Sequence, residues 1–141
     1  MVRKTFLLWG LLVALAILAA AQKPVVKKGP APETSPASGR EMYVSYCASC
    51  HGTTGKGNGP AATALKVPPP DLTILSRRNQ AKFPAAHVYQ VIKGDAAMAA
   101  HGSKEMPVWG PVFSSMSKGD QAMVQMRISN LTKYIESLQV K

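Results

Sequence analysis

The sequence is poor in cysteine, in aromatic residues and in acidic residues, and each shortage limits the kinds of site, core or partner that the protein can have. Two cysteines in 141 residues are too few for a zinc site built from several thiolates. Because aromatic residues make up only 6% of the chain, few large side chains can fill a small core, which leaves room for a bound cofactor. No strand-like alternation and no internal repeat is present, so the sequence predicts an all-α fold.

Acidic residues are outnumbered, with 7 Asp and Glu against 17 Lys and Arg and a formal net charge of +10. A basic surface attracts acidic partners. Nucleic acid is the other common partner of a basic domain, but here the cations are spread singly, and Arg77-Arg78 is the only adjacent pair in the predicted domain. We therefore expect protein partners with acidic docking surfaces and no nucleic acid.

The N-terminal region predicts export. Arg3 and Lys4 precede sixteen uncharged residues, Phe6 to Ala21, which is the pattern of a signal peptide. Three alanines at the end of this run suit cleavage, yet the run is also nearly long enough to span a bilayer. Residues 1–21 are thus either a signal peptide or an N-terminal membrane anchor, and both place the domain outside the cytoplasm.

A linker and one domain are expected after this segment. Residues 22–38 are rich in Pro, Lys, Ala and Ser without hydrophobic periodicity, which predicts a flexible linker. The folded domain is expected over residues 39–141. Its first helix is predicted from Gly39 to about Ala48, because Ser38-Gly-Arg-Glu fits a capping box.

Two further main helices follow a loop. Residues 52–70 are rich in Gly and Pro and predict a loop, with a short helix near residues 71–78. The second main helix is expected between Pro84 and Gly94. The third follows Asp120, and its apolar positions are three or four residues apart: Val124, Ile128, Leu131, Ile135 and Leu138.

Cys47, Cys50 and His51 form the most specific motif. Their spacing places all three side chains on one face of a helix. CxxCH is an attachment signature of c-type haem, in which two thiols bond to the vinyl groups and the imidazole reaches the iron. The sequence therefore predicts one covalently bound haem c with His51 as an iron ligand.

A redox-active or disulfide-forming CxxC and a zinc site are the alternative interpretations of this motif. Thioredoxin-like proteins place CxxC in an alternating βαβ setting, which this chain lacks. Zinc requires further ligands, and no other cysteine is present.

Met106 is the best candidate for a second axial ligand. It begins Met106-Pro-Val-Trp-Gly110, in which the proline stiffens the backbone and Gly110 permits a turn. His101 is a rival sixth ligand, whereas His87 is expected to be an ordinary surface or packing residue. Met98 and Met116 are expected in loops and stay open as candidates.

The remaining methionines have simpler interpretations. Met1 belongs to the export segment. Met42, Met123 and Met126 lie on predicted helices and are expected to be core or surface residues.

Together these motifs resemble the class I c-type cytochromes, especially small bacterial ones that are periplasmic or membrane-associated. The resemblance covers residues 39–139 and implies the cytochrome c fold, with three main helices and loops around one haem. It also implies His51 and Met106 as axial ligands. The residues that carry it are Cys47-Ala-Ser-Cys-His51-Gly52, Gly55-Lys-Gly57-Asn-Gly-Pro60, Met106-Pro-Val-Trp-Gly110 and Leu131-Thr-Lys-Tyr134-Ile135-Glu-Ser-Leu138.

The resemblance implies roles for residues around the haem. The carbonyl of Pro60 would accept a hydrogen bond from the non-ligating nitrogen of His51. Trp109 would line the haem pocket, with its indole N–H directed to a propionate. Arg77 and Arg78 are open between pairing with propionates and a solvated surface role.

A packing contact is implied as well. Gly39 and Tyr43 on the first helix would pack against Tyr134 on the last helix, near one haem edge.

The implied activity is one-electron transfer and not enzymatic catalysis. The domain would serve an electron transport chain in the bacterial periplasm or at the periplasmic face of the inner membrane. Membrane contact would come only from an uncleaved N-terminal segment. The alternatives are a haem subunit of a larger dehydrogenase or oxidase, and a haem sensor or peroxidase-like protein with a labile sixth ligand.

Overall fold

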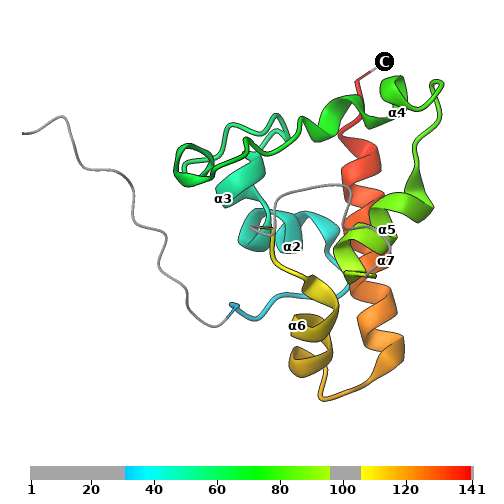
Figure 1. The fold of residues 1–141 in the computed structure, drawn as a ribbon. Coiled ribbons are helices and arrows are strands. Elements are labelled where there is room, and N and C mark those ends of the chain that lie inside the picture. The colour runs from blue at the N-terminus through cyan, green and yellow to red at the C-terminus, as the bar shows by residue number, and fades with distance from the viewer. Residues whose placement is uncertain (1–30, 96–105, 141) are drawn as a thin grey trace, which may run out of the picture.

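The computed structural model describes residues 31–95 and 106–140, and within these ranges it contains helices and loops but no strand (Figure 1). The predicted all-α class is confirmed. The helices are α2 (Gly39–Tyr46), α3 (Ala48–His51), α4 (Leu75–Arg78), α5 (Ala85–Lys93), α6 (Trp109–Met116) and α7 (Gln121–Ser137), and two short 3₁₀ turns are η1 (Ala62–Ala64) and η2 (Leu72–Ile74).

Several predicted features lie outside the described residues, namely the export segment over residues 1–21, Met98 and His101. Of the helices that are described, none is both long and apolar enough to cross a membrane.

At the crossing of α2 and α7 the two helix backbones come into direct contact. A Cβ atom at Gly39 would overlap the carbonyl oxygen of Asn130 and lie 2.9 Å from Cβ of Tyr134. One turn later, the rings of Tyr43 and Tyr134 pack with their centroids 5.2 Å apart. The packing that was implied for Gly39 and Tyr43 against Tyr134 is therefore confirmed.

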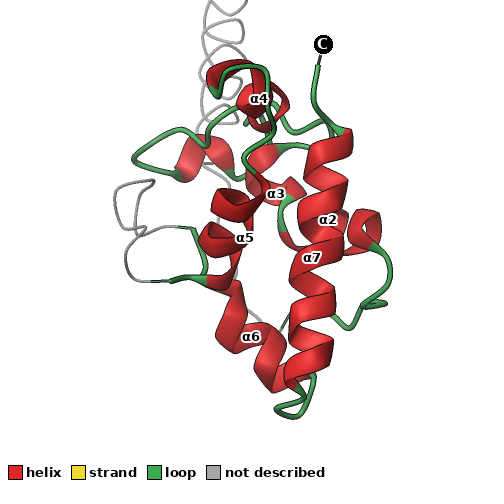
Figure 2. Ribbon diagram, turned by 90° about the vertical axis from the view of Figure 1, so that its right-hand side faces the viewer, coloured by secondary structure: helices red, strands yellow, loops and turns green. Residues whose placement is uncertain are grey.

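Helix α7 supplies the central wall of the core. Its predicted apolar face is buried at Val124, Ile128, Leu131 and Ile135, and Leu138 packs against the edge of the same cluster. Helices α5 and α6 pack on α7 and on each other (Figure 2). Asp120 caps the start of α7, since its carboxylate accepts the backbone N–H groups of Ala122 and Met123 at 2.9 and 3.2 Å.

Helix α6 was not predicted, because prolines and Gly110 near its start indicated a rigid turn. The structure corrects this prediction, since Gly110 is the second residue of the helix. Pro111 lies in the first helical turn, where a backbone N–H has no partner within the helix. A Cβ at Gly110 would overlap the carbonyl oxygen of Lys93, so this glycine serves the close approach of α6 to α5.

Residues 31–38, which were assigned to the linker, fold against the domain instead. Thr34 is only 9% exposed, and Ala31 packs on the core cluster. The side-chain amide of Asn130 donates to the carbonyl of Pro36 at 3.0 Å. We call residues 31–38 the N-terminal strap, and its polar contacts escaped prediction because they leave no hydrophobic periodicity in the sequence.

The contact of α2 with α7 predicts that substitutions at two glycines lower the free energy of unfolding by different amounts. We expect Gly39→Ala to lower the free energy of unfolding by about 2 kcal/mol, because the new methyl group overpacks the helix contact. Gly119 has a φ of 84° and no atom near its missing Cβ, so Gly119→Ala should cost about 1 kcal/mol of backbone strain alone. Denaturant unfolding of both variants measures the difference, and equal losses would contradict close packing at Gly39.

Candidate haem-binding site

The CxxCH motif lies where α2 gives way to α3. The predicted helix over residues 39–48 is divided at Cys47, which ends α2 and begins α3. The carbonyl of Cys47 accepts the backbone N–H groups of Cys50 at 3.1 Å and of His51 at 2.8 Å. The motif thus forms one helical turn, as its spacing predicted.

Both cysteines are free, partly buried thiols. Burial, with a further contribution from the neighbouring Cys50, raises the pKa of Cys47 to about 12. A redox-active CxxC relies on a thiol whose pKa is lowered, and the pKa of Cys47 is shifted in the opposite direction. Two free thiols on one helical turn fit covalent attachment to the vinyl groups of a haem.

His51 is buried at the end of α3, with 8% of its surface exposed. Its Nδ1 atom lies 3.4 Å from the carbonyl oxygen of Pro70. Burial lowers the pKa of the imidazole, although the contact with Pro70 acts in the opposite direction. The ring is therefore neutral at pH 7, and a proton on Nδ1 directed to Pro70 leaves the lone pair of Nε2 for a metal.

The loop after His51 folds back over α3. The N–H of Gly57 donates to the carbonyl of His51 at 2.8 Å, and that of Gly59 donates to the carbonyl of Cys50 at 3.0 Å. These bonds satisfy carbonyl groups that the end of a short helix leaves free. A Cβ at Gly57 would overlap the carbonyl oxygen of Pro69, so this glycine lets the proline segment come alongside the helix.

The residue that faces Nδ1 is Pro70 and not Pro60, which corrects the implied role of Pro60. The structure places Pro60 at an exposed position just before η1. The physical reason is the folding back of the loop, which carries its distal end and not its middle to the imidazole. The sequence signal for this end of the loop was the run of three prolines before Asp71.

Met106 lies on the segment that leads into α6 and is 37% exposed. Its role as an axial ligand stays a prediction. Met106 is nevertheless distinct, because every other described methionine lies on a helix: Met42 on α2, Met116 on α6, and Met123 and Met126 on α7. The expected loop position of Met116 was wrong, and its sulfur lies 3.9 Å from the hydroxyl of Tyr46.

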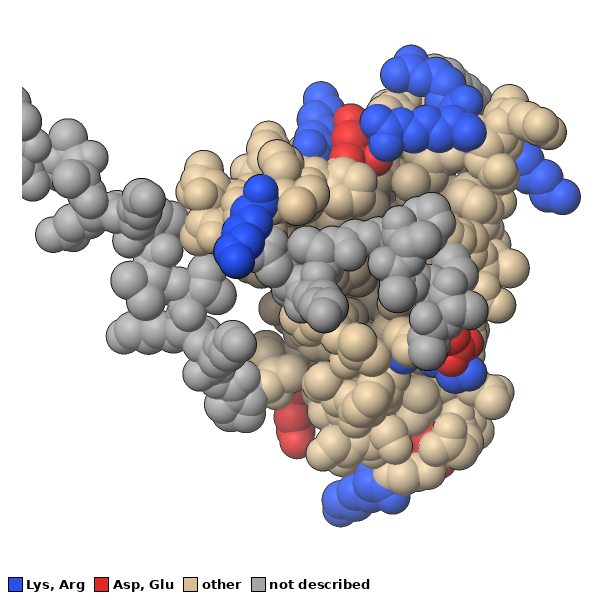
Figure 3. Space-filling view, viewed as in Figure 1, with Lys and Arg blue, Asp and Glu red and all other residues tan. Residues whose placement is uncertain are grey.

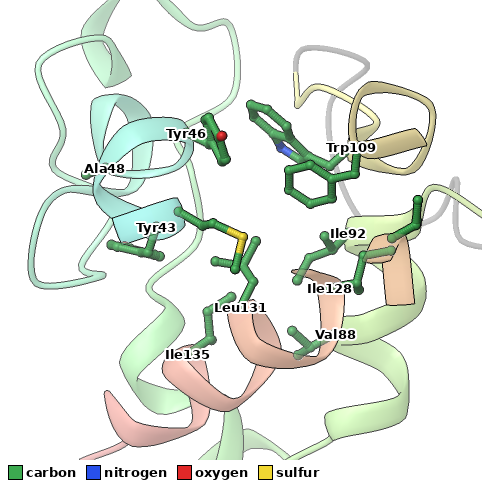
Figure 4. Close-up of a cluster of buried hydrophobic side chains, with 12 residues drawn as sticks. Tyr43, Tyr46, Ala48, Val88, Ile92, Trp109, Ile128, Leu131 and Ile135 are labelled. Carbon is green, nitrogen blue, oxygen red and sulfur yellow. The ribbon is translucent and has the colours of Figure 1, made fainter. Parts of the chain in front are cut away.

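Trp109 is the first residue of α6 and is buried against α2 (Figure 4). Its ring centroid lies 4.9 Å from that of Tyr46 and 5.7 Å from that of Phe113. Tyr46 directly precedes the CxxCH turn, so this aromatic cluster joins the Met106 segment to the helix that carries the thiols. Neither Tyr46 nor its cluster was identified from the sequence.

The other residues that the sequence analysis considered for the haem site are exposed or only half-buried. Arg77 and Arg78 are exposed at the end of α4, and His87 is half-buried on α5. In the described part of the chain, no group of three or more His, Cys, Asp or Glu side chains gathers in a way that could hold a metal ion.

Comparison with known proteins assigns the family. A family model described as cytochrome C oxidase, cbb3-type, subunit III matches residues 34–135, a range that includes most of the strap, the CxxCH turn and most of α7. No curated protein and no solved structure matches the chain. The chain therefore belongs to the family of cytochrome c oxidase, cbb3-type, subunit III, and residues 34–135 form a mono-haem cytochrome c domain.

Proposed function

We propose that this domain is a one-electron carrier, with a single haem c bonded to Cys47 and Cys50 and ligated by His51 and Met106. The observation that carries the proposal is the CxxCH turn, in which two free thiols accompany a buried neutral imidazole oriented by Pro70. A haem bound there supplies one-electron exchange between ferrous and ferric iron. If His51 and Met106 both ligated the iron of a bound haem, O₂ and peroxide would have no open site on it, which would favour electron transfer over catalysis.

The contribution of the chain itself is orientation and exclusion of water. The hydroxyl of Tyr43 donates to the carbonyl of Gly52 at 2.8 Å and so fixes the backbone just after His51. Trp109 and Phe113 close the core on the side of α6, and we assign Trp109 to the haem pocket. Pro107 restricts the backbone beside Met106, which helps to retain a weak thioether ligand.

A second candidate function follows from the family match. The name of the family is that of an oxidase subunit, which favours a haem subunit of a larger oxidoreductase over a free shuttle. Copurification of a stable complex from native membranes would support the subunit role, whereas a monomer that exchanges freely would support the shuttle.

Export is part of the proposal. The basic residues and the uncharged run at the N-terminus support transfer of the domain to the periplasm, where it works free or at the inner membrane.

The chain after His51 presents a cationic surface over residues 52–82, which supports docking to acidic redox proteins. Residues 52–82 contain five Lys and Arg and one acid, whereas the rest of the described domain from residue 39 contains five cations and four acids. The acid is Asp71, next to Pro70, and hydrogen bonds from Thr73, together with the nearby charges of Lys56 and Arg78, lower the pKa of Asp71. Figure 3 shows Lys and Arg side chains gathered at the upper end of the molecule around an acidic one.

The ligand assignment predicts the effect of Met106→Ala. We expect the variant to retain covalent haem, to lose the weak near-infrared band of Met-ligated ferric haem, and to have a much lower reduction potential, because loss of the thioether removes a ligand that favours ferrous iron. Spectroscopy and redox titration measure these effects. Met126→Ala is the matched control, since Met126 is 38% exposed and Met106 is 37% exposed.

An unchanged potential in Met106→Ala would exclude Met106 as the ligand. Absence of the band from the unmodified protein would favour the sensor or peroxidase-like alternative.

Replacement of both thiols tests covalent attachment. We expect Cys47→Ser with Cys50→Ser to yield a chain without haem that does not fold, because the haem supplies much of the core. Mass spectrometry reports the attached group and the processing of the N-terminus together, and circular dichroism reports folding. Ser49→Ala, between the two cysteines, should retain haem, and a stable folded double variant without haem would refute the prediction.

The cationic surface predicts a salt-dependent rate. Arg77→Glu with Arg78→Glu should slow electron transfer to plastocyanin, used as an acidic probe, by about tenfold at low salt, and the difference should vanish near 1 M salt. Stopped-flow kinetics measure the rate. Lys118→Glu with Lys133→Glu changes the net charge equally at exposed sites outside residues 52–82, and an equal slowing in this control would contradict local docking.

A further inference from the structure

Arg127 on α7 is a buried cation without an acidic partner among the described residues. Its side chain is 7% exposed, and its Nε atom has no hydrogen-bond partner. Its guanidinium lies over the ring of Phe113, 5.9 Å from the centroid, and Nη1 lies 3.9 Å from the sulfur of Met42. Among the described residues, the one oxygen that accepts from it is Oγ1 of Thr34 in the N-terminal strap, at 3.1 Å.

Thr34 also forms a hydrogen bond with Tyr46. The Thr34 and Tyr46 hydroxyl oxygens are 2.7 Å apart, and the Tyr46 hydroxyl donates to the carbonyl of Pro32 at 2.7 Å. Since a hydroxyl has one proton, Tyr46 must accept from Thr34 while it donates to Pro32. The bonds therefore run in one direction from Arg127 through Thr34 and Tyr46 to Pro32, and each donor in such a chain strengthens the next.

The ring of Tyr46, held in this way, packs against the ring of Trp109. The centroids of the two rings are 4.9 Å apart with an interplanar angle of 30°, and Figure 4 shows the rings next to each other. Trp109 lies three residues after Met106, and Pro107 between them restricts the backbone. The strap and the Met106 segment are thus connected through Tyr46 and Trp109, although Thr34 and Met106 are 72 residues apart in sequence.

We propose that Thr34, Tyr46 and Arg127 are positioning residues for the sixth ligand. They hold the strap against Tyr46, and the ring of Tyr46 keeps Trp109 in its packed position. In this way they keep the thioether of Met106 bound to the iron. This inference rests on the proposed function, because it takes Met106 to be the ligand. Methionine is a weak ligand, so its rate of release reports how often the supporting segment opens.

The test compares two identical substitutions in the ferric holoprotein. Thr34→Val removes the hydroxyl that joins Arg127 to Tyr46. Thr132→Val also removes a buried hydroxyl, but in the described part of the chain that hydroxyl bonds only within α7, to the carbonyl of Ile128 at 2.8 Å. The rate of Met106 release is measured as loss of the near-infrared band in saturating imidazole, where release limits the reaction.

We expect Thr34→Val to release Met106 about tenfold faster, the factor for one lost buried hydrogen bond, and Thr132→Val to release it at the rate of the unmodified protein. Tyr46→Phe keeps the ring but not the hydroxyl and should release Met106 as fast as Thr34→Val does. It replaces Thr34→Val in the test if that variant does not fold. Thermal unfolding of each variant separates this local effect from a general loss of stability.

Two outcomes overturn the inference in different ways. If both threonine variants release Met106 at the same rate, the strap does not position the ligand, while the electron-carrier function stands. If the unmodified protein has no near-infrared band, Met106 is not the ligand, and the inference fails together with that part of the proposed function.

Discussion

The contact of α2 with α7 at Gly39 is the constraint on which the site depends. Because the two backbones touch there, Tyr43 one turn later is buried with its hydroxyl on the carbonyl of Gly52 at 2.8 Å. Burial raises the pKa of Tyr43 above its ordinary value, so the hydroxyl remains a proton donor at physiological pH. Since Gly52 follows His51, the helix crossing also sets the position of the imidazole.

The two proposed axial ligands are supported in different ways. His51 is held by bonds within its own neighbourhood, because the loop over residues 52–70 returns to the carbonyls of α3 and brings Pro70 to Nδ1. The Met106 segment is held by distant parts of the chain, through Trp109, Tyr46 and the N-terminal strap. A strong ligand with local support and a weak ligand with long-range support suggest that release of the weaker one is the easier opening of the domain.

Local patterns in the sequence predicted most helices well. Ser38 caps α2 as its sequence predicted, and the helices expected to end before Gly94 and to begin after Asp120 do so. Predictions failed where a residue acts through a distant neighbour. Gly110 was predicted to mark a turn, yet it lies in α6, where the missing side chain lets the backbone of α5 approach. The polar residues of the strap were assigned to the linker, although Thr34 in the strap accepts a hydrogen bond from Arg127.

The haem-attachment motif could be predicted from residue spacing alone, since Cys47, Cys50 and His51 share one helical turn wherever that turn lies. The spacing of apolar residues likewise predicted the buried face of α7. In contrast, no local pattern predicted that Pro70 and not Pro60 faces the imidazole or that residues 31–38 belong to the domain. The reason is physical: helix geometry is fixed by neighbours within four residues, whereas loop return and strap docking depend on contacts between segments far apart in the chain.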